Sequence, residues 1–282
     1  MSGLAPAIIA DRFRAACRAE LEALKPGNVH VHEAGHGMTV ADFLASAEVS
    51  APALAAAGRS VGERILAAVE ATRSRVGQNT NLGIVLLCAP LAAAAERGGV
   101  LRPSLEDVLA RLDETDAALA FRAIRIASPG GLGRSKRHDV ATEPEVTLLD
   151  AMRTAAQRDR IARQYASGFA DVFDVGVPRL LACRAAGWQE EWAVTDLFLT
   201  MLSAFRDSHI ERKHGAETAE EVRREACSWA DRLLGVAEPI GLASELLGFD
   251  RSLKARGLNP GTSADLTVAS LFCAALDHDL IE

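Results

Sequence analysis

The most apolar part of the chain is Leu82-Gly83-Ile84-Val85-Leu86-Leu87-Cys88-Ala89-Pro90-Leu91-Ala92-Ala93-Ala94-Ala95. It carries no charged residue, and its 14 residues include Pro90. A helix that crosses a bilayer needs about 20 such residues. The stretch is therefore too short for a membrane span and is typical of a helix buried in a protein core.

Helical spacing of apolar residues continues on both sides of this stretch. Leu105, Val108, Leu109 and Leu112 recur at helical intervals, as do the apolar residues from Val194 to Met201. Sustained alternation with a period of two is almost absent. We expect an all-α fold, with residues 1–282 forming one compact multi-helix domain whose polar loops make a central cleft. The expected helices cover residues 4–24, 40–57, 60–76, 80–97, 105–123, 145–174, 177–187, 189–205, 217–234, 238–253 and 263–279.

The charge and cysteine content narrow the classes of function. The chain of 282 residues has a formal net charge of −7, which gives no electrostatic reason to expect nucleic acid or a membrane surface as partner. The first residues lack a basic region followed by an apolar core, so we expect no signal peptide. The five cysteines are scattered without a C-x-x-C pair. They are typical of small apolar core residues in a reducing compartment, so we expect a cytoplasmic protein.

The sequence His32-Glu33-Ala34-Gly35-His36 matches the zinc-protease pattern H-E-x-x-H. That pattern works only on a helix, where two histidines one turn apart bind zinc and the glutamate acts as general base. Gly35 lies inside the motif and Gly37 follows it, and each costs about 1 kcal/mol relative to alanine in a helix interior. We therefore expect a loop here, followed by a helix that Thr39 and Asp42 cap.

Two polar clusters lie where helices are expected to end or begin, and such clusters suit a phosphorylated ligand. Lys25-Pro26-Gly27-Asn28 puts a cation beside backbone N–H groups, although lysine and glycine are also common at helix C-termini. Gln78-Asn79-Thr80-Asn81-Leu82-Gly83 opens the most apolar helix. The N–H groups at a buried helix start favour anions, although capping by Asn79 or Thr80 alone would also explain this segment.

Two more clusters lie in the C-terminal third. The segment 207–215 mixes acids, bases and imidazoles within about two helical turns. The segment 259–266 is a turn followed by a capped helix start, where Asp265 could bind Mg²⁺ or only favour the helix dipole. Each cluster alone is explained by a hydrated loop. Their joint occurrence favours a ligand site.

Taken together and in this order, the motifs resemble those of the triphosphoribosyl-dephospho-CoA synthase family, across roughly residues 20 to 275. Members carry a K-P-G loop, a G-x-H segment followed by a D/F-rich helix start, an N-T-H-K-G helix start, a D-T-N…R-G-G segment and a C-terminal S-P-G-G-S-A-D-L. The matching residues are Lys25-Pro26-Gly27, Gly35-His36 with Asp42-Phe43, Asn79-Thr80-Asn81-Leu82-Gly83, Asp207-Ser208-His209 with Lys213-His214-Gly215, and Asn259-Pro260-Gly261-Thr262-Ser263-Ala264-Asp265-Leu266.

The chain departs from the family pattern at three places, and it resembles a divergent subgroup. Asn81-Leu82 replaces a His-Lys pair, which removes a cation expected to hold phosphate. The D-T-N and R-G-G segments are changed to Asp207-Ser208-His209 and Lys213-His214-Gly215. A middle segment that usually carries R-G-E has displaced acids and no arginine over residues 168–174.

The resemblance implies that a 2′-hydroxyl of dephospho-CoA attacks the anomeric carbon of ATP and that adenine leaves. The ligands implied are small-molecule nucleotides: ATP as substrate with Mg²⁺, and dephospho-CoA or a related cofactor precursor as acceptor. Whether the protein forms a homodimer is left open. The site residues that the resemblance implies are Asp207, His36 and His209 for catalysis; Lys25, Asn79, Thr80, Asn81, Arg212, Lys213, His214 and Ser263 for nucleotide binding; and Asp207, Asp265 and Asp42 for the metal.

Two other functions stay open. The lost His-Lys pair allows a non-catalytic or differently specific relative in cofactor biosynthesis, for example of a one-carbon pterin cofactor. A zinc hydrolase that uses His32, Glu33 and His36 is the least favoured alternative, because it needs the helix that the two glycines disfavour.

Overall fold

The computed structural model describes residues 2–33, 35, 37–129, 140–236 and 238–281. They form helices throughout, and no strand occurs within these ranges, so the expected all-α class is confirmed. The helices are α1 (Pro6–Glu22), α2 (Val40–Leu54), α3 (Val61–Val76), α4 (Leu82–Arg97), α5 (Leu101–Ala110), α6 (Glu114–Ala127), α7 (Leu148–Ala155), α8 (Arg160–Ser167), a π-helix η1 (Asp171–Gly176), α9 (Val177–Ala185), α10 (Glu190–Ala204), α11 (Ser208–His214), α12 (Ala216–Leu234), a 3₁₀ helix η2 (Pro239–Leu242), α13 (Ala243–Ala255) and α14 (Gly261–Ile281).

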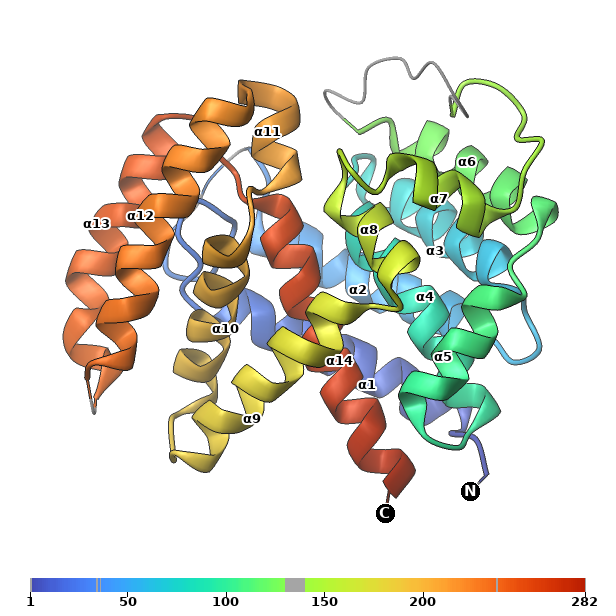
Figure 1. The fold of residues 1–282 in the computed structure, drawn as a ribbon, viewed down its shortest axis with the longest axis horizontal. Coiled ribbons are helices and arrows are strands. Elements are labelled where there is room, and N and C mark those ends of the chain that lie inside the picture. The colour runs from blue at the N-terminus through green and yellow to red at the C-terminus, as the bar shows by residue number, and fades with distance from the viewer. Residues whose placement is uncertain (1, 34, 36, 130–139, 237, 282) are drawn as a thin grey trace.

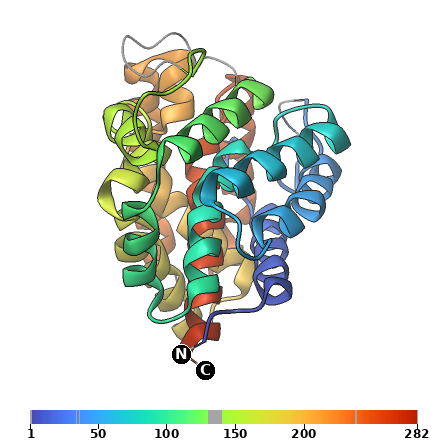
Figure 2. The same ribbon diagram turned by 90° about the vertical axis from the view of Figure 1, so that its right-hand side faces the viewer.

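Helices α4 and α14 pack against each other, and both are buried along most of their length. Helices α10 to α13 lie on one side of α14, and α2 to α8 lie on the other (Figure 1). The apolar stretch of α4 thus lies inside the protein, as expected from its composition. The start of α1 and the end of α14 lie at the same end of the molecule (Figure 2), where Arg12 Nε donates to Asp279 Oδ2 at 2.6 Å.

The apolar side chains form two cores. The larger one surrounds α4 and includes Phe13 of α1, Ile65 of α3 and Phe272 of α14. The smaller one joins α10, α12 and α13, with Phe198 and Leu253 among its fully buried residues. Because α14 contributes to both cores, its first turn lies where the two halves of the protein meet.

The helix starts follow the chemistry of their capping residues. Thr39 and Asp42 form the expected capping box at the start of α2, in which each side chain accepts a hydrogen bond from the other residue's backbone N–H. Ser60 with Glu63 and Asp113 with Asp116 form the same motif at α3 and α6.

Two expected helices are wrong, because each is interrupted in the structure. The range 105–123 is split between α5 and α6 by the Asp113 capping box. The range 145–174 is divided into α7, α8 and the π-helix: Asp159 caps a new helix, and Gly168 ends that helix with a φ of 62°. Apolar spacing runs on across these breaks, which is why it does not reveal them.

The expected loop at residues 30–37 is confirmed for its described residues. His32, Glu33 and Gly35 lie between α1 and α2, with isolated antiparallel bridges from His30 to Glu33 and from Gly35 to Met38. His36 lies outside the described residues. No single described helix is long and apolar enough to span a membrane; α4 and α5 meet that standard only together, and they are bent by 113° at their junction.

Candidate functional site

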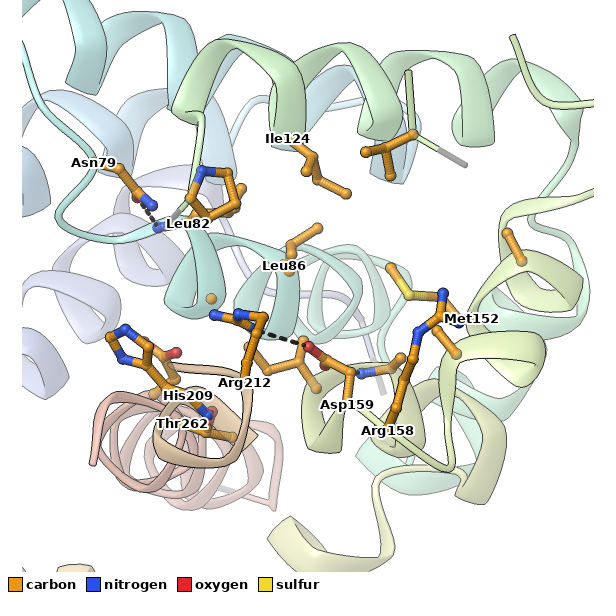
Figure 3. A pocket seen from close by; sticks show the side chains of 18 of the residues that line it. Asn79, Leu82, Leu86, Ile124, Met152, Arg158, Asp159, His209, Arg212 and Thr262 are labelled. Atoms are coloured by element: carbon orange, nitrogen blue, oxygen red, sulfur yellow. Dashed lines mark hydrogen bonds and ion pairs between the residues drawn. The ribbon is translucent and has the colours of Figure 1, made fainter. Parts of the chain in front are cut away.

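A cavity of about 450 Å³ lies where α4, α6, α7, α8, α11 and α14 meet. One part of its wall is apolar, and Leu86, Ile124 and Met152 point into it (Figure 3). The other part is polar and is built mainly from the first turns of α8, α11 and α14, together with the segment before α4. The polar residues of the wall are Asn79, Thr80, Arg158, Asp159, His209, Glu211, Arg212, Thr262 and Asp265.

Asp265 lies in the first turns of α14 and lines the cavity beside the start of α4. Its carboxyl group makes no hydrogen bond or ion pair with any residue in the described ranges. Burial raises the pKa of Asp265 well above its ordinary value, and the nearby carboxylates Asp207 and Glu20 raise it further. The group is therefore available to a ligand, and a cation or a hydrogen-bond donor would satisfy it.

Asp159 and Arg212 face each other across the polar part of the cavity (Figure 3). Asp159 Oδ1 accepts the Ala162 N–H at 3.0 Å and so caps α8, whereas Oδ2 lies 3.4 Å from Arg212 Nη1. Arg158 and Arg212 both line the cavity, and two guanidinium groups there suit a phosphate or carboxylate ligand.

His209 stands at the start of α11, next to Thr262 of α14. Its backbone N–H lies 2.9 Å from Asp207 Oδ1 and 3.2 Å from Thr262 Oγ1. The Thr262 hydroxyl also lies 3.1 Å from Ser208 Oγ, so α11 and α14 are tied together at their first turns. The imidazole is thereby carried on two helix starts that form one wall.

Asp207 is buried, and its carboxylate joins α11 to α14. Besides the His209 N–H it accepts the N–H of Ile210 at 3.2 Å, and its Oδ2 accepts both the N–H and the hydroxyl of Ser263, at 2.7 and 2.8 Å. Burial raises the pKa of Asp207, and the hydrogen bonds from Ser263 oppose that effect. Neither Asp207 nor Ser263 lines the cavity. Their contacts assign them to positioning the wall rather than to contacting a ligand.

Lys25 is fully buried and does not line the cavity, although it was expected to. Its ammonium group forms an ion pair with Glu20 and donates to Asn28 Oδ1 at 2.9 Å. Burial lowers the pKa of Lys25 and raises the pKa of Glu20. The lysine holds the turn after α1 in place, because its donors are committed to these buried acceptors.

In the segment before α4, some side chains line the cavity and others point into the core. Asn79 Oδ1 accepts the Leu82 N–H at 3.2 Å, while Asn79 and Thr80 both line the cavity. The Thr80 hydroxyl lies 2.6 Å from Ser46 Oγ. Asn81 is turned towards α2, where its Nδ2 donates to Ser50 Oγ at 3.3 Å, and it does not line the cavity.

The remaining expected residues lie elsewhere. Asp42 is held in the capping box of α2 and does not line the cavity; hydrogen bonds from Thr39 lower its pKa. Lys213 and His214 are exposed at the last turn of α11, outside the cavity wall. The structure thus brings Asn79, Thr80, His209, Arg212 and Asp265 to one cavity, and leaves the other described candidates outside it.

The zinc motif does not form a metal site in the described residues. His32 Nε2 lies 2.9 Å from the carbonyl oxygen of Glu22 and 3.0 Å from Glu191 Oε1. Glu33 Oε2 lies 3.7 Å from Arg251 Nη1. No set of three or more histidine, cysteine, aspartate or glutamate side chains in the described ranges is arranged to hold a metal ion.

Sequence reasoning missed Arg158 and Asp159, because both fell inside the helix expected over 145–174. A local signal was present: Asp159 precedes the amphipathic run Ile161, Ala162 and Tyr165, and Gly168 follows it. Aspartate before such a run and glycine after it are typical of the two ends of a helix.

The fold and the cavity together define an all-helical protein with one cavity whose wall combines apolar side chains with carboxylates, arginines and an imidazole. Residues 6–281 match the family model of the ATP:dephospho-CoA triphosphoribosyl transferases (CitG), and the chain belongs to that family.

Several relatives share this assignment. The chain is 32% identical over 207 residues to a protein of Albidiferax ferrireducens (strain ATCC BAA-621 / DSM 15236 / T118) named "Probable 2-(5''-triphosphoribosyl)-3'-dephosphocoenzyme-A synthase". That match covers 72% of this chain and 62% of the relative, so the chain corresponds to less than two thirds of that protein's length. A relative of the same name from Stutzerimonas stutzeri (strain A1501) is 27% identical over 209 residues, again covering 72% of this chain and 62% of the relative.

A solved structure shows the same fold. It is the crystal structure of an Archaeoglobus fulgidus protein with a provisional name as a triphosphoribosyl-dephospho-CoA synthase. It superposes with a TM-score of 0.65 at 30% sequence identity, covering 83% of this chain and 99% of the other.

Proposed function

We propose that this protein transfers the triphosphoribosyl group of ATP to dephospho-CoA or a related cofactor precursor and releases adenine. One observation carries the proposal besides family membership: a single cavity combines an apolar wall with three carboxylates, two arginines and an imidazole. A nucleotide needs this combination, because its base is largely apolar, its ribose is polar and its phosphates are anionic.

The reaction breaks the bond between the anomeric carbon and the adenine nitrogen, and it forms a bond from that carbon to a hydroxyl oxygen of the acceptor. The hydroxyl proton leaves to a base, and the adenine nitrogen takes up a proton. Positive charge develops on the sugar in the transition state, as in glycoside cleavage. We assign stabilisation of this charge to the carboxylates of Asp159 and Asp265, which both line the cavity.

Proton transfer requires a base and an acid on the same cavity wall. We assign removal of the hydroxyl proton to Asp159, whose Oδ2 is engaged by Arg212 at 3.4 Å rather than by a backbone N–H. We assign protonation of adenine to His209, because it is the imidazole among the described residues of the cavity wall and imidazole groups commonly act as general acids. His36, the other expected catalytic histidine, stays a prediction because it lies outside the described residues.

The negative charge of the triphosphate requires positively charged groups in the site. Arg158 and Arg212 line the cavity and are suited to bind phosphate oxygens by charge-assisted hydrogen bonds. For Mg²⁺ we assign Asp265, because its carboxyl is unengaged in the described structure, whereas Asp207 already accepts four hydrogen bonds. A protein site for Mg²⁺ often uses one or two carboxylates together with substrate phosphates, and the ion would neutralise triphosphate charge there.

Adenine release tests the proposal. Purified protein is incubated with ATP, Mg²⁺ and dephospho-CoA, and free adenine is followed by chromatography. We expect adenine only when both nucleotides are present. Binding of ATP without adenine release would instead support the non-catalytic alternative. We place the reaction in the cytoplasm, and a homodimer stays an untested prediction.

A further inference from the structure

Two glycines stand where a side chain would collide with a functional group of the cavity wall: Gly83, which lines the cavity, and Gly261, which lies behind His209 outside the lining. A Cβ atom at Gly83 would lie 2.5 Å from Asp265 Cγ and 2.8 Å from Ile161 Cδ1. A Cβ atom at Gly261 would lie closer to the His209 ring than van der Waals contact allows, and Nδ1 would be its nearest ring atom. Carbon atoms in favourable contact are about 3.5–4.0 Å apart, so neither position has room for alanine as the structure stands.

Backbone conformation does not explain these two glycines. Neither Gly83 nor Gly261 has a positive φ, and both lie in the first turn of a helix. Glycine there is less favourable than alanine by up to about 1 kcal/mol. The space that the missing side chain leaves is therefore the physical reason for glycine at these positions.

The atoms that fill the two spaces are the ends of side chains, which can rotate away. An added methyl group at position 83 is accommodated if the Asp265 carboxyl turns, and one at position 261 is accommodated if the His209 ring turns. The fold should then survive with little loss, while the cavity loses the placement of its carboxyl and its imidazole.

We propose that Gly83 and Gly261 are positioning residues that hold Asp265 and His209 in their working orientations. The inference rests on the proposed function, since it assumes that those two side chains act on the ligand. The proposal therefore predicts that an alanine substitution at either position lowers the activity and has little effect on the stability of the protein.

Four single variants test the proposal. Gly83→Ala and Gly261→Ala are expected to lower kcat for adenine release about 100-fold, as misplacement of a catalytic group by about 1 Å can do. Gly248→Ala is the neutral control, because Gly248 is exposed on α13 with open space around its Cβ position, and its kcat should stay within about twofold of the parent.

Gly176→Ala is the structural control. A Cβ atom there would lie 2.5 Å from Met201 Cε and 2.8 Å from Ser270 Cβ, away from the cavity. It should lower the melting temperature by several degrees and leave kcat per folded molecule within about threefold. Gly83→Ala should show the reverse pattern, with a small thermal shift and a large loss of kcat.

A double variant isolates the link between Gly83 and Asp265. If Gly83 acts only through that carboxyl, adding Gly83→Ala to Asp265→Ala causes no further loss of activity. A further loss equal to that of the single Gly83→Ala variant would overturn the proposal. So would an undiminished kcat of Gly83→Ala.

A crystal structure of the Gly83→Ala protein separates this proposal from the proposed function. We expect the Asp265 carboxyl to move by more than about 1 Å, since the van der Waals contacts above demand it. An unmoved carboxyl overturns the positioning role whatever the activity is. Absence of adenine release by the parent protein overturns the proposed function, and with it the assignment of Gly83 to catalysis, while the crystal structure still decides whether the glycine places the carboxyl.

Discussion

Asp207 accepts two hydrogen bonds from a single residue, Ser263: one from its backbone N–H at 2.7 Å and one from its hydroxyl at 2.8 Å. Asp207 caps α11 and Ser263 lies in the first turn of α14, so this contact fixes the two helix starts that form the polar wall of the cavity. Asp207 was expected to bind a metal and to catalyse the reaction. Its four accepted hydrogen bonds instead point to a structural role.

Asp207→Ala should destabilise the protein by about 3 kcal/mol or more, because it leaves several buried donors without an acceptor. Urea unfolding measures this change. Asp207→Asn should recover part of the loss, since its side-chain oxygen can still accept from one of the two helices. A change below about 1 kcal/mol for Asp207→Ala would contradict the structural role.

Arg212→Ala should raise the KM for ATP at least 10-fold, as expected when one charge-assisted hydrogen bond to phosphate is lost. The neighbouring Lys213 offers a matched control, because it has the same charge but is exposed outside the cavity wall. Lys213→Ala should leave KM within about twofold. Steady-state kinetics of adenine release measure both, and equal effects of the two variants would refute the assignment of Arg212.

Glu33→Gln should leave adenine release within about twofold of the parent, because Glu33 lies on a loop and contacts Arg251 rather than a cavity group. Metal analysis of the purified protein should find no stoichiometric zinc. One zinc per chain together with loss of activity in this variant would restore the hydrolase alternative.

The buried His30 should make folding stability depend on pH. Burial lowers the pKa of His30, and Lys254 lowers it further, while the facing Asp250 opposes the effect. In the unfolded chain the pKa is about 6.5, so below that pH the unfolded state binds a proton that the folded state does not. The stability contribution is therefore present above about pH 6.5 and is lost as the pH falls.

Denaturant unfolding at pH 7.5 and 5.5 tests this sign. The parent should lose more stability on acidification than His30→Asn does, by up to about 1.4 kcal/mol per pH unit. His278→Asn is the control, because the His278 side chain is 67% exposed. Identical pH dependence of the parent and His30→Asn proteins would show that His30 keeps an ordinary pKa.

Much of the fold is predictable from sequence because apolar periodicity and capping residues act locally. The buried helix α4 and the Thr39–Asp42 capping box are confirmed on that basis. The break at Asp159 is not revealed by periodicity, since apolar residues continue at helical spacing on both sides. Because the break was not predicted, Arg158 and Asp159 were not among the predicted site residues.

The predicted site residues were also only partly correct, because some of them line the cavity and others point into the core. A polar residue at a helix start can point into a cavity or into the core, and the sequence does not distinguish the two. Asn79 lines the cavity, whereas its neighbour Asn81 bonds to Ser50 in the core. Lys25 is directed inward by Glu20, a partner that precedes it by five residues but lies on the buried face of α1.

Product stoichiometry tests the central claim most directly. Mass spectrometry follows dephospho-CoA in a reaction with ATP and Mg²⁺, while adenine is quantified in the same sample. We predict one adenine released for each acceptor molecule that gains the mass of a triphosphoribosyl group, and no such product with Arg212→Ala at low ATP. Release of ADP and phosphate instead of adenine, with the acceptor unchanged, would contradict the account.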